Sequence, residues 1–230
     1  CENNRKICVF CGSGNTGVEP ARDRRYYRCA ACGGIWMEPL YRLDGSRERD
    51  RYLLHDNSLE NGGYRSYLES FLEAVFSFSA ICAGYTPGKW KILDYGSGPS
   101  PSLSVLMRKR GDEVRSWDPF FAPDTPRFRT GADLVTCLEV AEHFYEPRKD
   151  FALMARGLKA GGFLALGTQC IPSVPFDLWW YRQDPTHVSF YTESALSLVA
   201  ATAGIGFLGK AAPHVYVFRK QGLKTARAAD

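Results

Sequence analysis

Four of the eight cysteines stand in two pairs whose spacing suits a metal ion. Cys8 and Cys11 form one C-x2-C pair, Cys29 and Cys32 form the other, and seventeen residues separate the pairs. Two residues between cysteines let both sulfurs turn toward one ion at about 2.3 Å. A disulfide framework would distribute the cysteines more widely, so the spacing predicts one structural Zn²⁺ held by all four. Zinc-bound thiolates also indicate a reducing compartment, and we expect a cytoplasmic protein.

A glycine turn follows a buried strand in the middle of the chain. Gly96 and Gly98 let the backbone approach a ligand closely because they carry no Cβ. The dinucleotide fingerprint needs a third glycine three residues after Gly98, where this chain has proline. Asp94 suits a ligand with a cationic amine, and Asp118, after the next strand, can accept hydrogen bonds from both hydroxyls of a ribose. Together these residues predict S-adenosylmethionine rather than NAD.

Two histidines are expected at the same open end of the sheet. Methyl transfer from a sulfonium is a direct displacement, so an enzyme mainly aligns the reacting atoms. A hydroxyl or enol acceptor must also lose its proton, and imidazole suits that work near neutral pH. We therefore predict that His143 and His187 are catalytic, with capping a turn and ordering a loop as the alternatives. Glu139 and Glu142 could hold the ligand amine, a hydroxyl or a divalent cation.

Three adjacent aromatic residues, Trp179, Trp180 and Tyr181, precede Asp184. They cannot all face one core, so we expect at least one of them to be exposed or to line a pocket. The segment is then either a flap that covers the sheet or a platform for a planar or glycan-like acceptor. Trp180 and Tyr181 are therefore candidate substrate-binding residues.

The elements that must position these residues alternate between strand and helix. After a zinc-ribbon segment and a polar stretch, apolar residues at helical spacing predict a helix over 64–83. Further helices are expected over 101–110, 150–159 and 193–203, and strands over 90–95, 113–117, 132–138, 163–167, 206–209 and 215–219. This alternation predicts an α/β, Rossmann-like fold with a doubly wound, mostly parallel sheet. The last two strands have no helix between them and predict an antiparallel edge hairpin.

The interval after Asp118 is too short for a complete crossover. Fourteen residues separate Asp118 from Asp133, and three of them are prolines. A strand and a helix do not fit comfortably in that length. The third strand is therefore expected to be reduced to a piece such as Arg127–Arg129, or to be missing.

Composition and charge exclude several classes of protein. A chain of 230 residues that is 45% hydrophobic and 23% charged can bury a sizeable core and is not of disordered composition. No apolar run approaches the roughly 18 residues that cross a bilayer. The net charge of +4, with ten basic and nine acidic residues in 1–60, is too small to indicate a nucleic-acid partner.

The motifs resemble those of class I S-adenosylmethionine-dependent methyltransferases. Asp94-x-Gly96-x-Gly98, Asp118 and the run Leu138–His143 are similar to the motifs of strands one, two and four, particularly in the quinone- and small-molecule-methylating branch. Within that superfamily the chain resembles a bacterial group with an N-terminal zinc ribbon. The features shared with that group are His55-x-Asn57 with Asn61 and Tyr64, Asp118–Phe121, and Asp184–His187. The resemblance extends from Cys8 to about Lys220.

The resemblance implies a division of the chain and a set of ligand-binding residues. Residues 1–40 are expected to form the zinc ribbon, 41–63 a linker that contributes to the active-site cover, and 64–230 the class I methyltransferase domain. The residues predicted to bind S-adenosylmethionine are Asp94, Gly96, Ser97, Gly98, Asp118, Pro119, Phe120 and Glu139. Those predicted to bind the acceptor are His55, Tyr64, Glu142, Trp180 and Tyr181.

Two departures from the family pattern affect the cofactor site. Ser100 stands where the turn usually has its third glycine, and no acidic residue follows a third strand to approach the adenine amino group. We therefore expect Pro119, Phe120 and Phe121 to form the adenine wall, with one phenylalanine ring against the base. The alternative is that both rings only fill the gap left by the short crossover.

The function predicted from these features is that of an enzyme, a methyltransferase that O- or C-methylates a hydroxyl or enol of a small or carrier-linked metabolite. One alternative is an RNA methyltransferase that docks its substrate with the zinc ribbon, although the small charge of residues 1–60 does not favour it. Another is a docking module that has lost activity, against which the intact Asp94, Gly96, Gly98 and Asp118 argue. The sequence predicts neither the acceptor nor the oligomeric state.

Overall fold

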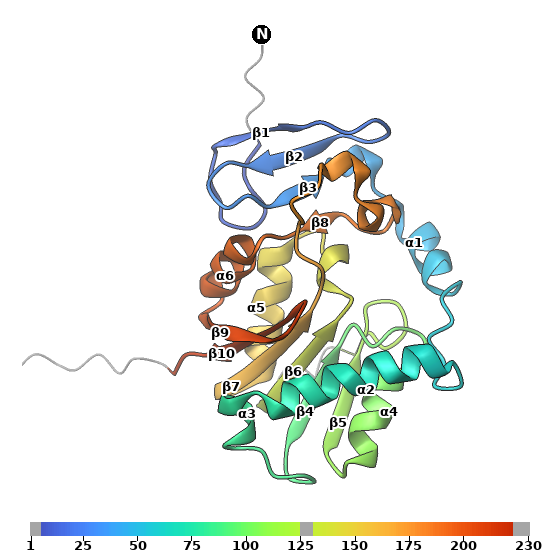
Figure 1. Cartoon of the computed structure of the whole chain (residues 1–230), viewed down its shortest axis with the longest axis vertical. Helices are drawn as coiled ribbons and strands as arrows, with labels where there is room; N and C mark the ends of the chain where they lie inside the picture. The colour runs from blue at the N-terminus through green and yellow to red at the C-terminus, as the bar shows by residue number, and fades with distance from the viewer. Residues whose placement is uncertain (1–5, 125–130, 223–230) are drawn as a thin grey trace, which may run out of the picture.

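A six-stranded sheet forms the centre of the computed structural model, which describes residues 6–124 and 131–222 (Figure 1). The strand order is β5-β4-β6-β7-β10-β9. The strands are β4 (Lys91–Tyr95), β5 (Glu113–Trp117), β6 (Ala132–Leu138), β7 (Leu158–Gly167), β9 (Ile205–Ala212) and β10 (Val215–Lys220). Strands β5, β4, β6 and β7 run parallel, and β10 is antiparallel to both β7 and β9. The predicted mostly parallel sheet and its antiparallel edge hairpin are confirmed.

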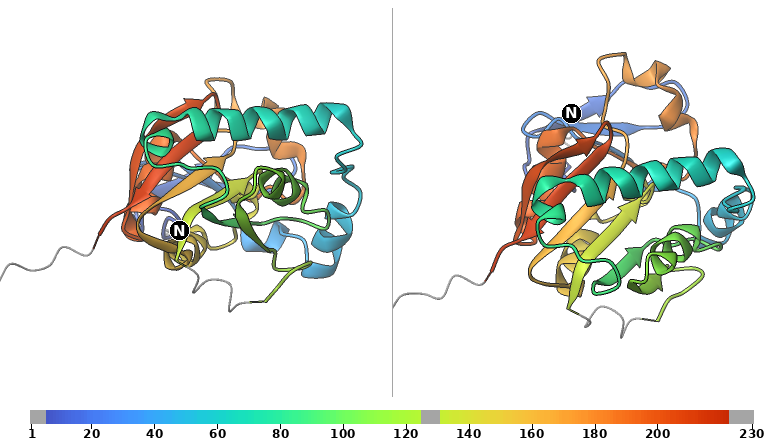
Figure 2. Two further views of the ribbon diagram at one scale, coloured as in Figure 1. Left: turned by 90° about the horizontal axis from the view of Figure 1, so that it is seen from below. Right: turned by 60° about the horizontal axis from the view of Figure 1, so that its bottom comes forward.

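Helices cover both faces of this sheet because its strands are apolar on both sides. Within β4, Ile92 packs with the helices of one face and Leu93 with those of the other. The first face carries α2 (Gly62–Ser77), α3 (Ser79–Cys82) and α4 (Ser102–Lys109); the second carries α5 (Pro147–Gly157) and α6 (Glu193–Thr202). Figure 2, seen from below in its left view, shows α2 and α5 on opposite sides of the strands.

The helix α5 differs from the expected range of 150–159. It begins at Pro147, which suits the first helical turn, and it ends at Gly157. Gly161 and Gly162, which lie between the expected helix and the expected strand over 163–167, belong to β7. A Cβ on Gly162 would lie only 2.9 Å from the carbonyl oxygen of Ala132, so a glycine is needed where β7 meets β6.

Beyond β5, which lies at the edge of the sheet, no further strand is paired in the part of the chain that the structure describes. The expected piece Arg127–Arg129 lies outside the described residues. Immediately after β5 the chain turns, and Asp118 and Ala122 form an isolated antiparallel bridge. In a complete connection between two parallel strands, a crossover helix would follow β5; here the turn follows it instead.

Three strands within residues 16–37 belong to a second sheet, and a later segment of the chain supplies its fourth strand. Its order is β1-β2-β3-β8, all antiparallel. The strands are β1 (Thr16–Glu19), β2 (Tyr26–Cys29), β3 (Ile35–Met37) and β8 (Ser189–Phe190). Figure 1 shows this sheet stacked above α5 and α6. Phe10 lies with its ring centroid 5.0 Å from that of Tyr191, so the ribbon shares a hydrophobic cluster with the central sheet.

Residues 41–63, expected to be an irregular linker, contain the short helix α1 (Gly45–Tyr52). The Asp44 carboxylate caps this helix by accepting a hydrogen bond from the Arg47 backbone N–H. Polar residues that predicted a linker therefore belong to a helix, and their side chains face either the solvent or the cavity. None of the helices in the described ranges has the length and apolar character needed to span a membrane.

Candidate active site

A cavity of about 1100 Å³ lies at the carboxyl ends of β4, β5 and β6. Ligands in open α/β sheets bind at this edge. The predicted site residues that line it are Gly96, Ser97, Gly98, Asp118, Pro119, Phe120, Glu139, His55, Tyr64, Glu142, His143, Trp180, Tyr181 and His187. Segments that are far apart in the sequence are thus brought together around one space.

Asp94, which was predicted to bind the cofactor, does not line this cavity. Its side chain is 3% exposed and accepts hydrogen bonds from the Ser104 hydroxyl at 2.7 Å and the Thr136 hydroxyl at 3.1 Å. Burial raises the pKa of the Asp94 carboxyl. The carboxylate therefore joins β4 to α4 and β6, and the structure does not place it where it would meet the amine of a ligand.

The glycine turn after β4 has a conformation that other residues would not adopt easily. Gly96 and Gly98 have φ angles of 78° and 66°, in the left-handed region. A Cβ on Gly96 would lie 2.5 Å from the side chain of Val140, which follows β6. The backbone N–H groups of Gly96 and Ser97 both donate to the carbonyl oxygen of Trp117. The turn is therefore held against the strands on both sides.

Asp118 organises the loops around the turn. One carboxylate oxygen accepts from the backbone N–H of Gly98 at 2.9 Å, and the other accepts from those of Phe120 at 2.9 Å and Phe121 at 3.1 Å. A carboxylate has about four acceptor positions. The loop therefore occupies most of the capacity predicted for the two ribose hydroxyls, and about one position is left for a ligand.

Phe120 and Phe121 have different surroundings. Phe120 lines the cavity and has its centroid 5.8 Å from that of Tyr52 on α1. Phe121 is not among the lining residues, and the Arg49 guanidinium lies 5.4 Å from its ring centroid. The structure thus separates two rings that the sequence could not distinguish.

Glu139 lines the cavity directly after β6, and its backbone has a φ of 51°. A non-glycine residue with this backbone is uncommon and marks local constraint. Its carboxylate accepts hydrogen bonds from the hydroxyls of Tyr67 at 2.9 Å and Tyr181 at 3.2 Å. Burial, together with the charge of Glu142, raises the pKa of Glu139 to about 8.

Glu142 is buried deeper, at 1% exposed. Its Oε2 accepts from the Thr168 hydroxyl at 2.8 Å, whereas its Oε1 has no hydrogen-bond partner. Burial raises the pKa of this carboxyl as well. A buried carboxylate oxygen without a partner is rare in folded proteins.

The two histidines share one arrangement. Nδ1 of His143 lies 3.0 Å from the carbonyl oxygen of Thr186, and Nδ1 of His187 lies 2.6 Å from that of Tyr181. A carbonyl only accepts, so each Nδ1 carries the proton and each Nε2 is left with its lone pair. Burial lowers the pKa of His143 to about 3 and also lowers that of His187, so both rings are neutral at pH 7. Their centroids are 4.9 Å apart.

Arg51 on α1 holds the segment that carries His187. Its guanidinium donates to one oxygen of Asp184 at 2.7 and 3.2 Å, and the other oxygen accepts from the backbone and hydroxyl of Thr186. Burial opposes ionisation of Asp184, but the hydrogen bonds from Arg51 and Thr186 hold its pKa well below the usual range. The family features Asp184–His187 thus form a turn that presents the imidazole.

Some cavity residues were not predicted from the sequence. Tyr67 lies in the helix that the apolar spacing predicted over 64–83, but it is 43% exposed and its hydroxyl donates to Glu139. Arg51 and Tyr52 were part of a charged linker. The signal available for Tyr67 was its position three residues after Tyr64, which places both on one helical face. At the mouth of the cavity, Trp180 is 64% exposed, as expected for one member of the aromatic run.

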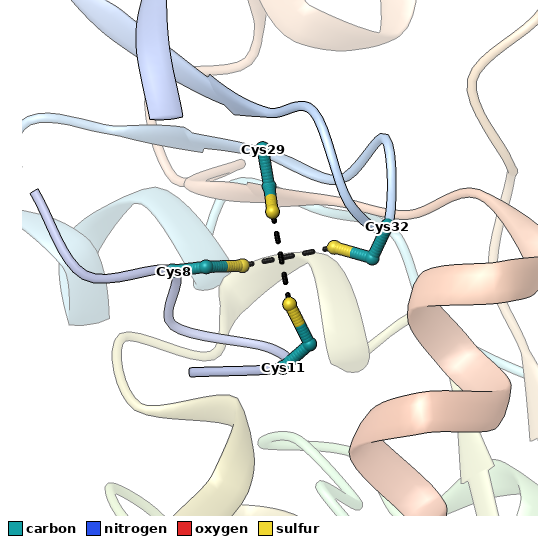
Figure 3. A group of neighbouring side chains, drawn as sticks. All are labelled: Cys8, Cys11, Cys29 and Cys32. Carbon is teal, nitrogen blue, oxygen red and sulfur yellow. Dashed lines mark hydrogen bonds between the residues drawn. The ribbon is translucent and has the colours of Figure 1, made fainter. Parts of the chain in front are cut away.

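The four ribbon cysteines meet at one point (Figure 3). The sulfurs of Cys8 and Cys32 are 3.6 Å apart, those of Cys11 and Cys29 are 3.7 Å apart, and all four lie within 4.8 Å of one another. Four sulfurs at 2.3 Å from a tetrahedral Zn²⁺ are separated by about 3.8 Å. The residues therefore fit the predicted zinc ion.

Comparisons with known proteins agree with the fold. Residues 53–206 match a family model described as a methyltransferase domain. An O-methyltransferase family protein from Burkholderia thailandensis has a similar structure, with a TM-score of 0.52 and 14% identity over 77% of this chain and 60% of that one. Magnesium protoporphyrin IX methyltransferase from Synechocystis PCC 6803, with bound SAH, has a TM-score of 0.50 and 15% identity over 76% of this chain and 94% of that one.

At these identities the likeness to solved structures shows the fold alone. No protein of curated function matches the chain. The family match covers more than half of the residues and includes β4, β5 and β6 with the loops that line the cavity. The chain therefore belongs to the methyltransferase domain family, and its fold is that of the class I, S-adenosylmethionine-dependent methyltransferases.

Proposed function

We propose that this methyltransferase transfers its methyl group to a hydroxyl or enol oxygen, or the carbon of an enol, in a small or carrier-linked metabolite. The observation that carries the proposal is the pair of neutral imidazoles, His143 and His187, in the cavity that also contains the Gly96–Gly98 turn. Each has a free Nε2 that can accept a hydrogen bond from an acceptor hydroxyl. This arrangement suits an acceptor hydroxyl that the two rings orient by hydrogen bonds; with a pKa of about 3, His143 is too weak a base to hold the proton itself.

The cofactor end of the cavity is proposed at the glycine turn. S-adenosylmethionine supplies the electrophilic methyl group when it is bound. The Gly96 and Gly98 backbone can approach it closely, the remaining acceptor position of Asp118 suits a ribose hydroxyl, and Phe120 suits the adenine face. Glu139 lines the same cavity, where its carboxyl can accept from the ligand amine that Asp94 does not reach.

The ribbon is proposed to bind one structural Zn²⁺ through Cys8, Cys11, Cys29 and Cys32. The tetrahedral spacing of the sulfurs supports this, and a site with four protein ligands leaves no position for substrate. The division into residues 1–40, 41–63 and 64–230 and the cytoplasmic location stay predictions.

The test is a methyl-transfer assay with isotopically labelled S-adenosylmethionine. Catechols, nucleotide sugars and total RNA serve as separate acceptor pools, and mass spectrometry identifies the methylated atom. We expect label on oxygen or carbon of a small molecule, and a loss of at least tenfold in His187→Ala. Label only in RNA, with a strong dependence on salt, would instead establish the RNA alternative.

A further inference from the structure

We propose that Glu142, His143 and His187 bind a divalent first-row transition-metal cation with open coordination positions toward the cavity. In the proposed function this cation takes the place of the direct hydrogen bonds from the acceptor hydroxyl to the two Nε2 atoms and holds the acceptor oxygen instead, and that role rests on the proposed function. The binding site itself rests on the geometry of the three side chains.

The three side chains converge on one point. One ligand atom of each lies within 4.8 Å of the other two, and Nε2 of His143 is 3.9 Å from Oε1 of Glu142. Ligands at about 2.1 Å from a shared ion are separated by about 3.0–3.5 Å. Small side-chain movements therefore bring all three to coordination distance.

Glu142 provides the strongest indication that something is bound. Its Oε1 is buried and has no hydrogen-bond partner, although its other oxygen is satisfied by Thr168. A buried acceptor atom without a partner loses its hydration with nothing in return, so such groups are normally paired or bind a metal. A cation next to Oε1 would compensate this cost.

The histidines have the orientation that metal ligands usually have. A coordinating imidazole commonly donates its other N–H to a carbonyl or carboxylate, which fixes the tautomer and the ring. His143 and His187 donate in this way to the carbonyl oxygens of Thr186 and Tyr181. Both Nε2 atoms are therefore left as the free lone-pair donors.

The chemistry of the donors selects the type of cation. Two imidazoles and one carboxylate suit Mn²⁺, Fe²⁺, Co²⁺ or Zn²⁺ better than Mg²⁺ or Ca²⁺, which prefer oxygen ligands. Three protein ligands in a cavity leave positions for an acceptor oxygen. The ribbon offers four thiolates, which fill all coordination positions of a tetrahedral ion. The two sites are therefore expected to select different ions.

The cation would make methyl transfer easier by lowering the pKa of the acceptor hydroxyl. The hydroxyl loses its proton to water in the cavity, and the oxygen then forms a bond to the methyl carbon with its own electron pair. The carbon–sulfur bond breaks with its electron pair on sulfur, so the sulfonium becomes a neutral thioether. No oxidant or reductant is required.

The test is a titration of the whole protein, with its ribbon zinc retained, with Mn²⁺ followed by electron paramagnetic resonance. Thiolate sites do not favour Mn²⁺, so the signal reports the cavity. We expect one Mn²⁺ per chain, and an affinity at least tenfold lower in Glu142→Gln and in His187→Gln. His214→Asn is the matched control: it removes a histidine from the β9–β10 turn, where φ is 62° and asparagine is tolerated.

Two results would overturn the proposal: no Mn²⁺ binding by the wild type at millimolar concentration, or equal binding by wild type, Glu142→Gln and His187→Gln. Circular dichroism shows which variants are folded, and either variant alone is sufficient for the comparison. Calorimetry with S-adenosylmethionine separates the cation from the proposed function. Cofactor binding and methyl transfer without Mn²⁺ binding overturn only the cation, whereas Mn²⁺ binding without any methylated small molecule overturns the proposed acceptor.

Discussion

The cysteine cluster of the ribbon and the Glu142/His143/His187 cluster of the cavity place metal-binding side chains in opposite settings. The cysteine sulfurs face one another at 3.6 and 3.7 Å, and three of the four cysteines are buried in a hydrophobic cluster. The cavity cluster borders a space of about 1100 Å³. The first arrangement suits a closed structural ion, and the second suits an ion or proton-accepting site with room for a substrate.

The two clusters also differ in how the chain builds them. Each cysteine pair is a local turn, whereas His187 reaches Glu142 only because the segment before β8 folds back onto the loop after β6. The backbone N–H of Val188 donates to the carbonyl oxygen of Glu142, and β8 then pairs with β3 of the ribbon. The ribbon therefore supports the segment that carries His187, and the closed site stabilises part of the open one.

The largest expected effect is loss of the ribbon site. Cys29→Ser should remove zinc, disorder the ribbon and, because β3 would no longer support β8, lower methyl transfer at least tenfold. Structural zinc sites contribute on the order of 10 kcal/mol to folding of small modules. The measurements are zinc content, thermal unfolding and methyl transfer.

Cys82→Ser is the control for this experiment because Cys82 is exposed. It should change none of the three measurements. Less than half an equivalent of zinc in wild-type protein purified without chelator would contradict the closed site. Normal activity in a zinc-free Cys29→Ser protein would break the connection between the two clusters.

The next effect concerns the cofactor end. Asp118→Ala should weaken S-adenosylmethionine binding by about 1.5–3 kcal/mol, because it removes a ligand contact and the hydrogen bonds that shape the loop from Gly98 to Phe121. Titration calorimetry measures the change. Unchanged affinity would show that another group holds the ribose, and NADH binding of equal strength would contradict the cofactor assignment.

A smaller difference should separate the two phenylalanines. Phe120→Ala is expected to cost about 1–3 kcal/mol of cofactor affinity, because its ring lines the cavity. Phe121→Ala should instead lower the free energy of unfolding, since that ring packs against Arg49. Calorimetry and denaturant unfolding of both variants provide the test. Equal cofactor affinity in the two variants would favour the alternative that both rings only fill the gap left by the short crossover.

The smallest effect is expected from Arg51, which positions His187 through Asp184. The folded-state pKa of Asp184 lies below its unfolded value, so this pair stabilises the protein above about pH 4 and loses that contribution as the pH falls. Arg51→Ala should lower stability at pH 7 by about 0.5–1 kcal/mol, because partial exposure screens the pair. It should also flatten the acid side of the stability profile.

Arg47→Ala on the same helix is the matched control, because its pairing with Asp44 is largely exposed. It should leave both stability and methyl transfer close to wild type. Equal acid profiles for Arg51→Ala and the wild type would show that Asp184 is held by Thr186 alone.

Much of the fold could be predicted from the sequence because its signals are local. The C-x2-C spacing, the Gly96–Gly98 turn and the alternation of apolar strands with amphipathic helices each lie within a few residues, so the order of elements and the closed cysteine cluster followed directly. Element ends were less well predicted: Gly161 and Gly162 resemble a helix stop, but strand pairing places them inside β7. At Gly162 the backbone of β7 approaches that of β6 so closely that only glycine fits, and this explains the glycine there without a helix end.

Side-chain direction and long-range pairing were decided only by the tertiary structure. Asp94 has the position of a ligand-binding acid in its motif, but the alternation of β4 turns it toward α4, where two hydroxyls satisfy it. Contacts between residues far apart in the chain likewise decide three other features. They are the separation of Phe120 from Phe121, the helix in the linker and the pairing of β8 with the ribbon. The unpartnered oxygen of Glu142 beside His143 and His187 exists because the packing of three segments removes water from a carboxylate, and no spacing along the sequence records that burial.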